Sequence, residues 1–139
     1  MTKAIIVDID KTIATIVDRH YYDWGKVESD LPIPFTIDLV KRYPNKVIIL
    51  TGRATGHKKG TVYGREATER WIKTHLGDVE CVLMRDAGDY RSSVVLKKEL
   101  LELNVIGKYN VEFALDDDDE VCEMYNSFGI PTLVVKAEV

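Results

Sequence analysis

The stretch Lys3-Ala-Ile-Ile-Val-Asp-Ile-Asp10 decides the fold prediction, because it is a short apolar run that ends in two carboxylates. Such a run, rich in β-branched residues, is typical of a strand buried on both faces of a sheet. Four similar runs occur at residues 46–51, 80–85, 111–116 and 132–135. The sequence therefore predicts five short strands.

Segments with helical spacing of apolar residues lie between these strands, at residues 33–43, 63–76, 92–103 and 119–128. Strands that alternate with helices predict a doubly wound α/β fold, with a mostly parallel five-stranded sheet between two helical layers. We expect one domain over residues 1–139, as this length suggests. Residues 12–31 depart from the alternation and are expected to form a small flap after the first strand.

Composition restricts the classes of function. The net charge of −4 argues against broad coating of nucleic acid, although it allows a local basic cleft. The basic residues between positions 53 and 73 are equally consistent with a cleft and with a solvated surface. No apolar stretch is long enough for a membrane span, and no signal peptide is evident, so a cytoplasmic protein is expected. Cys81 and Cys122 are predicted to be buried free thiols.

Polar residues follow four of the predicted strands. They are Asp8 and Asp10, then Thr51-Gly52-Arg53, then Arg85, and last the run Asp116-Asp117-Asp118-Asp119. Ligands of open parallel sheets bind beyond the carboxyl ends of the strands, so these side chains are expected at one edge. Asp10 is expected in the loop that follows the first strand.

The oxygen-rich set predicts a chemistry. Carboxylates without histidine or cysteine suit a hard cation such as Mg²⁺, and would also accept Mn²⁺. A carboxylate nucleophile can form an acyl phosphate and divide a difficult hydrolysis into two steps. A helix is expected to begin near Asp119, so we predict that one or two of the four consecutive aspartates cap it and that one or two serve the metal.

These residues together resemble the haloacid dehalogenase-like phosphatases. The pattern Asp-x-Asp-x-Thr is matched by Asp8, Asp10 and Thr12, and the later motifs by Thr51, Lys97 and the pair Asp116-Asp117. The chain is more similar still to the phosphatase domain of phage polynucleotide kinase/phosphatases. That similarity covers essentially the whole chain, including Thr51 to Gly56, Arg85 to Arg91 and Asp116 to Tyr125.

The resemblance implies a role for each matching residue. Asp8 would attack phosphorus, and Asp10 would protonate the leaving oxygen and later activate water. Asp8, Asp10 through its backbone, and Asp117 would hold Mg²⁺. Thr51 and Lys97 would bind phosphoryl oxygens, with Asp116 steadying Lys97. The substrate-side residues would be Thr12, Arg53 and Arg85.

Two positions depart from the family pattern. Lys11 stands where glycine usually follows the second aspartate, and Asp118 stands where the phage enzymes have arginine. The second change removes a cation from the substrate side and bears on polynucleotide specificity. The P-loop pattern G-x-x-x-x-G-K-[ST] is absent, so no 5′-kinase activity is expected from this chain.

The leading hypothesis is a Mg²⁺-dependent phosphatase that removes 3′-phosphates from DNA or RNA ends in nucleic-acid repair, with a separate kinase or ligase as partner. Tyr21, Tyr22 or Trp24 could then stack on a base or simply pack the flap. The alternatives are a small-molecule phosphatase or nucleotidase, a receiver-like signalling domain, and an inactive phosphate-binding protein. The order of the motifs argues against a receiver, since the acidic pair follows the first strand. The sequence indicates no oligomeric state.

Overall fold

The computed structural model describes residues 1–17, 19–56 and 63–136. At its centre is a sheet with the strand order β5-β4-β1-β6-β7, in which every neighbouring pair is parallel. Its strands are β1 (Thr2–Val7), β4 (Lys46–Ala54), β5 (Cys81–Arg85), β6 (Tyr109–Asp116) and β7 (Thr132–Val134). The predicted five-stranded parallel sheet is therefore confirmed.

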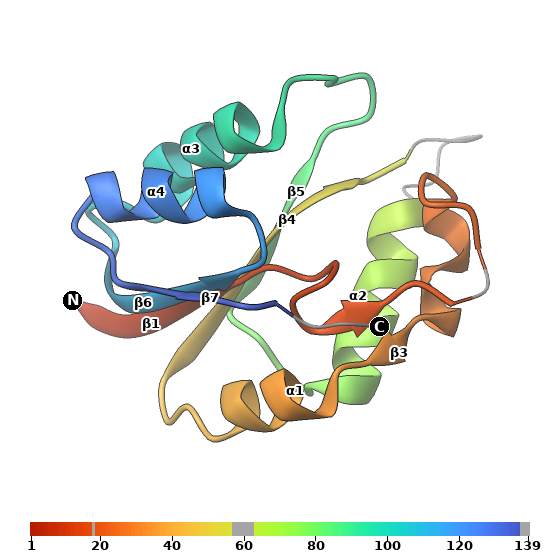
Figure 1. The fold of residues 1–139 in the computed structure, drawn as a ribbon, viewed down its shortest axis with the longest axis horizontal. Coiled ribbons are helices and arrows are strands. Elements are labelled where there is room, and N and C mark those ends of the chain that lie inside the picture. The colour runs from red at the N-terminus through yellow and green to blue at the C-terminus, as the bar shows by residue number, and fades with distance from the viewer. Residues whose placement is uncertain (18, 57–62, 137–139) are drawn as a thin grey trace.

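Helices cover both faces of the sheet (Figure 1). They are α1 (Pro34–Lys41), α2 (Tyr63–His75), α3 (Ser93–Asn104) and α4 (Asp119–Ser127). One buried cluster joins the sheet to α3 and α4, and a second joins it to α1 and α2. The predicted doubly wound architecture is thus confirmed, with helix ends within two residues of the predicted ones.

The central strand β1 shows why this sequence builds two layers. Successive side chains of a strand point to opposite faces, and Ala4 and Ile6 belong to the cluster with α3 and α4. Ile5 and Val7 belong to the cluster with α1 and α2. All four are fully buried, and burial of each larger side chain contributes about 1.5–3 kcal/mol.

The flap after β1 is the expected departure from the alternation. Strand β2 (Ala14–Thr15) pairs with β3 (Leu31–Pro32) in an antiparallel ribbon, and the 3-10 helix η1 (Trp24–Ser29) lies between them. Trp24 and Val27 pack against Ala67 of α2. A Cβ added at Gly64 would lie 2.6 Å from the Ala54 carbonyl oxygen, so only glycine allows this close approach of α2.

Two expectations need correction or limitation. Cys122 is a buried free thiol, but Cys81 is only half-buried because it lies on the edge strand β5. The basic surface of α2 is largely paired: Arg65 with Glu69, Arg70 with Glu28 and Lys73 with Asp78. Lys58 and Lys59 lie outside the described residues.

None of the helices in the described ranges has the length and hydropathy needed to cross a membrane.

Lys11 adopts a backbone conformation that explains why glycine suits its position. Its φ is +64°, and it is the one non-glycine residue with a positive φ in the described part of the chain. The left-handed region costs a residue with a Cβ about 1–2 kcal/mol. The side chain is exposed, so it crowds no packed neighbour.

We predict that Lys11→Gly stabilises the protein by about 0.5–1 kcal/mol, because relief of this strain exceeds the entropy that glycine adds to the unfolded chain. Urea denaturation measures the change. Lys11→Ala is the control, since it removes the charge but keeps the Cβ, and it should give no gain. Equal stabilisation by both variants would show that charge, and not backbone strain, matters at this position.

Candidate active site

The sheet register brings the first carboxylates together. Val7 of β1 pairs with Leu115 of β6, so the next residues, Asp8 and Asp116, lie side by side at the carboxyl ends of these strands. The Asp8 amide donates to the Leu115 carbonyl at 3.0 Å and holds this alignment one residue further. Between β1 and β6 the strand order reverses, which is where doubly wound sheets bind ligands. Strand β1 ends at Val7, so both Asp8 and Asp10 follow it, and Asp10 lies in the loop after the strand as expected.

Lys97 of α3 bridges the two carboxylates. Its Nζ lies 3.0 Å from Asp8 Oδ1 and 2.7 Å from Asp116 Oδ2, with all three side chains buried. Burial alone would lower the pKa of Lys97, but the charges of Asp8 and Asp116 outweigh it and raise the pKa above its ordinary value. Lys97 is therefore a fixed ammonium at the floor of the site, with Asp116 steadying it.

Asp117 completes an acidic cluster. Carboxylate oxygens of Asp8, Asp116 and Asp117 lie within 4.8 Å of one another. Burial and the negative charge of Asp8 raise the pKa of Asp117 to about 7. When all three carboxyl groups are ionised, the one ammonium of Lys97 leaves two negative charges uncompensated. An all-oxygen donor set with this deficit fits a hard divalent cation such as Mg²⁺.

The four consecutive aspartates divide their roles as predicted. Asp116 and Asp117 belong to the acidic cluster, whereas the Asp118 carboxylate accepts two backbone N–H groups at the start of α4, at 2.9 and 3.3 Å. Asp119 is the first residue of α4 and lies 3.5 Å from Lys136. Asp118 is therefore a helix cap, a role that an arginine at this position could not fill.

Hydroxyl groups complete the surroundings of Asp8. Thr12 Oγ1 donates to Asp8 Oδ2 at 2.9 Å, so both Asp8 oxygens have a donor and the carboxylate has a fixed orientation. Thr51 of β4 is also buried and lines the same cavity of about 230 Å³. Other residues around this cavity are Asp10, Lys11, Lys97, Asp116 and Asp117.

Asp10 lies at this cavity but outside the acidic cluster. Its carboxylate is held by Arg53, with Nε 3.0 Å from Oδ2 and Nη2 2.8 Å from Oδ1. A metal contact through its backbone, as the family pattern implies, stays a prediction. Arg53 is 1% exposed and contacts Asp10, Asp30 and Thr68, so the structure places it as the residue that orients Asp10. Its contact with substrate stays a prediction.

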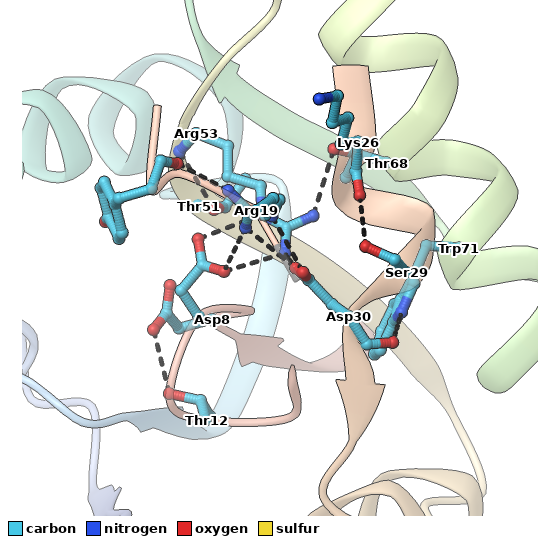
Figure 2. Close-up of polar contacts among 12 residues, drawn as sticks. Asp8, Thr12, Arg19, Lys26, Ser29, Asp30, Thr51, Arg53, Thr68 and Trp71 are labelled. Atoms are coloured by element: carbon cyan, nitrogen blue, oxygen red, sulfur yellow. Dashed lines mark hydrogen bonds and ion pairs between the residues drawn. The ribbon is translucent and has the colours of Figure 1, made fainter. Parts of the chain in front are cut away.

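Two residues of this network, Arg19 and Asp30, were not predicted from the sequence. Arg19 in the flap binds Asp30 with two nitrogens, each at 2.9 Å, and its Nη2 lies 3.6 Å from Asp10. Arg53 also reaches Asp30 at 2.9 Å, so contacts from both arginines converge on this buried carboxylate (Figure 2). Trp71 donates to the Asp30 carbonyl at 2.8 Å. The sequence offered one indication of this role, because Arg19 is the one arginine in the aromatic segment of residues 12–31.

A second, wider cavity of about 590 Å³ lies beside the first and is lined by the flap, the end of β4 and residues 85–93. Arg85 lines it, as expected of a substrate-side residue. Its guanidinium is tied to the carbonyl oxygens of Gly52 at 2.9 Å, Asp89 at 3.1 Å and Arg91 at 2.6 Å. Arg85 therefore fixes the loop after β5, and its contact with substrate stays a prediction.

We predict that Mg²⁺ raises the melting temperature by roughly 5 °C at saturation, because the cation binds the folded acidic cluster and not the unfolded chain. Asp117→Asn should abolish most of this shift. Asp119→Asn is the matched control, since it removes an exposed carboxylate two residues away and should keep the shift. Differential scanning fluorimetry measures it, and equal shifts in both variants would contradict the assigned cluster.

A family model of the polynucleotide kinase PNKP phosphatase domain matches residues 2–138. The chain is 28% identical over 138 residues to a bifunctional polynucleotide kinase/RNA ligase of Autographa californica nuclear polyhedrosis virus. That match covers 94% of this chain and 19% of the viral protein. The chain therefore spans about a fifth of the length of this relative.

Solved structures agree with this relationship. A chain in the structure of the Pnkp1/Rnl/Hen1 RNA repair complex superposes with a TM-score of 0.83 and 35% identity, over 96% of this chain and 42% of that one. The D,D-heptose 1,7-bisphosphate phosphatase of B. bronchiseptica, solved with magnesium and phosphate, has a TM-score of 0.61 and 14% identity, over 95% of this chain and 79% of that one. The second likeness shows the fold alone. The family match over nearly the whole sequence shows that this chain belongs to the PNKP phosphatase domains, which are haloacid dehalogenase-like phosphatases.

Proposed function

We propose that this phosphatase removes 3′-phosphates from DNA or RNA ends through an aspartyl-phosphate on Asp8, with Mg²⁺ bound at the acidic cluster. The observation that carries the proposal is the buried contact of Asp8 with Lys97 inside the smaller cavity. The contact holds a carboxylate oxygen and a fixed cation together where a phosphoryl group would enter. Carboxylate nucleophiles and electrostatic clamps are the two parts that phosphoryl transfer requires.

In the first step, an Asp8 oxygen forms a bond to phosphorus while the bond from phosphorus to the sugar oxygen breaks. Asp10, oriented by Arg53, gives its proton to the departing oxygen. Lys97 and Thr51 bind phosphoryl oxygens. A cation at Asp8, Asp116 and Asp117 would offset the negative charge of the phosphoryl group when bound.

In the second step, water attacks the phosphorus of the acyl phosphate and gives a proton to Asp10. The bond between Asp8 and phosphorus then breaks, which releases inorganic phosphate and returns Asp8 as a carboxylate and Asp10 as a protonated acid. The same residue thus acts first as acid and then as base. Thr12 keeps Asp8 in one orientation through both steps.

Family and geometry support a nucleic-acid end as substrate. The relatives are named for polynucleotide kinase, RNA ligase and RNA repair, and a wide cavity with aromatic walls lies next to the phosphate site. A kinase or ligase that acts on the same ends is the partner we propose. Pairing of the basic residues on α2 favours a substrate held mainly at its terminus, and it leaves a nucleotidase as the second candidate.

Phosphate release from a 3′-phosphorylated oligonucleotide with Mg²⁺ tests the proposal, with mononucleotides and an aryl phosphate measured in parallel. We expect the oligonucleotide to have the highest kcat/KM. Asp8→Asn should reduce turnover of every substrate by at least about 10³-fold, because an amide cannot serve as the nucleophile.

Asp38→Asn, on α1, is the control for a change of one surface carboxylate and should leave turnover unaltered. Preference for mononucleotides would support the nucleotidase instead. Full activity of Asp8→Asn would contradict the mechanism for any substrate.

A further inference from the structure

The wide cavity opens directly beside the phosphate cavity. Tyr21, Gly52 and Ser93 border both of them, so a group leaving the phosphate cavity past these residues enters the wide one. At about 590 Å³, the wide cavity is of the size that binds small organic ligands. Whatever is attached to the scissile oxygen therefore has a formed space to occupy.

Three aromatic rings of the flap form one wall of this cavity. Tyr21 and Tyr22 meet edge to face with ring centroids 4.9 Å apart, and Tyr21 lies 5.4 Å from Trp24. Trp24 is buried, whereas 71% of Tyr22 is exposed. A large exposed ring that packs against other rings at a cavity wall is costly in water and offers a face for stacking.

Arg19 holds this aromatic wall in place. Arg19 Nη1 donates to the carbonyl oxygens of His20 at 3.2 Å and Tyr21 at 2.6 Å, and its guanidinium lies 5.5 Å from the centre of the Trp24 ring. The same guanidinium is bound to Asp30. The aromatic wall is thus anchored to the network that orients Asp10, and it needs little ordering when a ligand binds.

The loop of residues 85–93, which also lines the wide cavity, is held in place as well. Arg85 ties the loop after β5 to Gly52, which itself borders both cavities. Asp89 and Arg91 in that loop are paired with each other. The cavity is therefore bordered by the aromatic rings of the flap and by a largely polar loop that is held in place, a combination that suits a flat base with a polar edge.

We propose that the wide cavity binds the nucleoside that carries the 3′-phosphate, with its base stacked on Tyr22. This inference rests on the proposed function and adds to it a subsite for the terminal base. The occupant we propose is the terminal base, because Tyr21, Gly52 and Ser93 border both cavities and the group attached to the scissile oxygen therefore lies next to the wide cavity. Tyr22 then distinguishes nucleotide ends from other phosphate esters.

A cycle of two substrates and three proteins tests the subsite. The substrates are a short oligonucleotide with a 3′-phosphate and the same oligonucleotide with an abasic 3′-terminal residue. The proteins are the unaltered chain, Tyr22→Ala and Tyr22→Phe. We expect the unaltered chain and Tyr22→Phe to prefer the base-bearing substrate by about tenfold in KM, and Tyr22→Ala to lose that preference.

Phe35→Ala removes an aromatic ring that is 78% exposed on α1, away from both cavities, and should keep the preference. Retention of the preference by Tyr22→Ala would overturn the subsite while leaving the 3′-phosphatase intact. A protein that hydrolyses an aryl phosphate but neither oligonucleotide would contradict the proposed function, and the subsite with it.

Discussion

The acidic cluster at one edge of the sheet has more negative than positive charge, and the candidate active site depends on this imbalance. The register of β1 against β6 places Asp8 next to Asp116 and Asp117, and the single ammonium of Lys97 meets three carboxylates there. Like charges at such distances are unfavourable in a partly buried site, so the folded chain favours any cation that enters. The acidic cluster is thus a direct consequence of the fold, and it suits a hard cation.

A second buried network close by has the opposite property. Asp10 and Asp30 face Arg19 and Arg53, so the charges of two guanidinium groups balance those of two carboxylates whenever Asp10 is ionised. A balanced network of this kind orients side chains and attracts no further ion. It joins the flap to the end of β4, which places the flap beside Asp8 and aligns Asp10 with it. We therefore propose that the acidic cluster binds ligands, whereas the second network fixes the positions of side chains.

Much of this could be predicted from the sequence, for identifiable reasons. Apolar runs rich in β-branched residues marked the buried strands, and the rule that ligands bind at the carboxyl edge gathered Asp8, Thr51 and the later aspartates. The capping role within the aspartate run followed from helix-start chemistry and is confirmed at Asp118.

Other features depend on contacts between distant segments. The contact of Arg53 with substrate stays a prediction, whereas its bonds to Asp10 and Asp30 could not be predicted, because they depend on the flap that brings Asp30 within reach. The role of Arg19 could not be predicted from the sequence, because its contacts with Asp10 and Asp30 depend on where the flap lies. The half-burial of Cys81 depends on β5 being the edge strand, and the sequence alone does not fix strand order.

In the proposed mechanism, Asp8 carries the phosphoryl group during turnover. An acid quench during turnover of an oligonucleotide with a radiolabelled 3′-phosphate, followed by peptide mapping, tests this step. We expect label on the peptide that contains Asp8, and hydroxylamine should release it, as it does from an acyl phosphate. Turnover without labelled protein, or label on another residue, would contradict it.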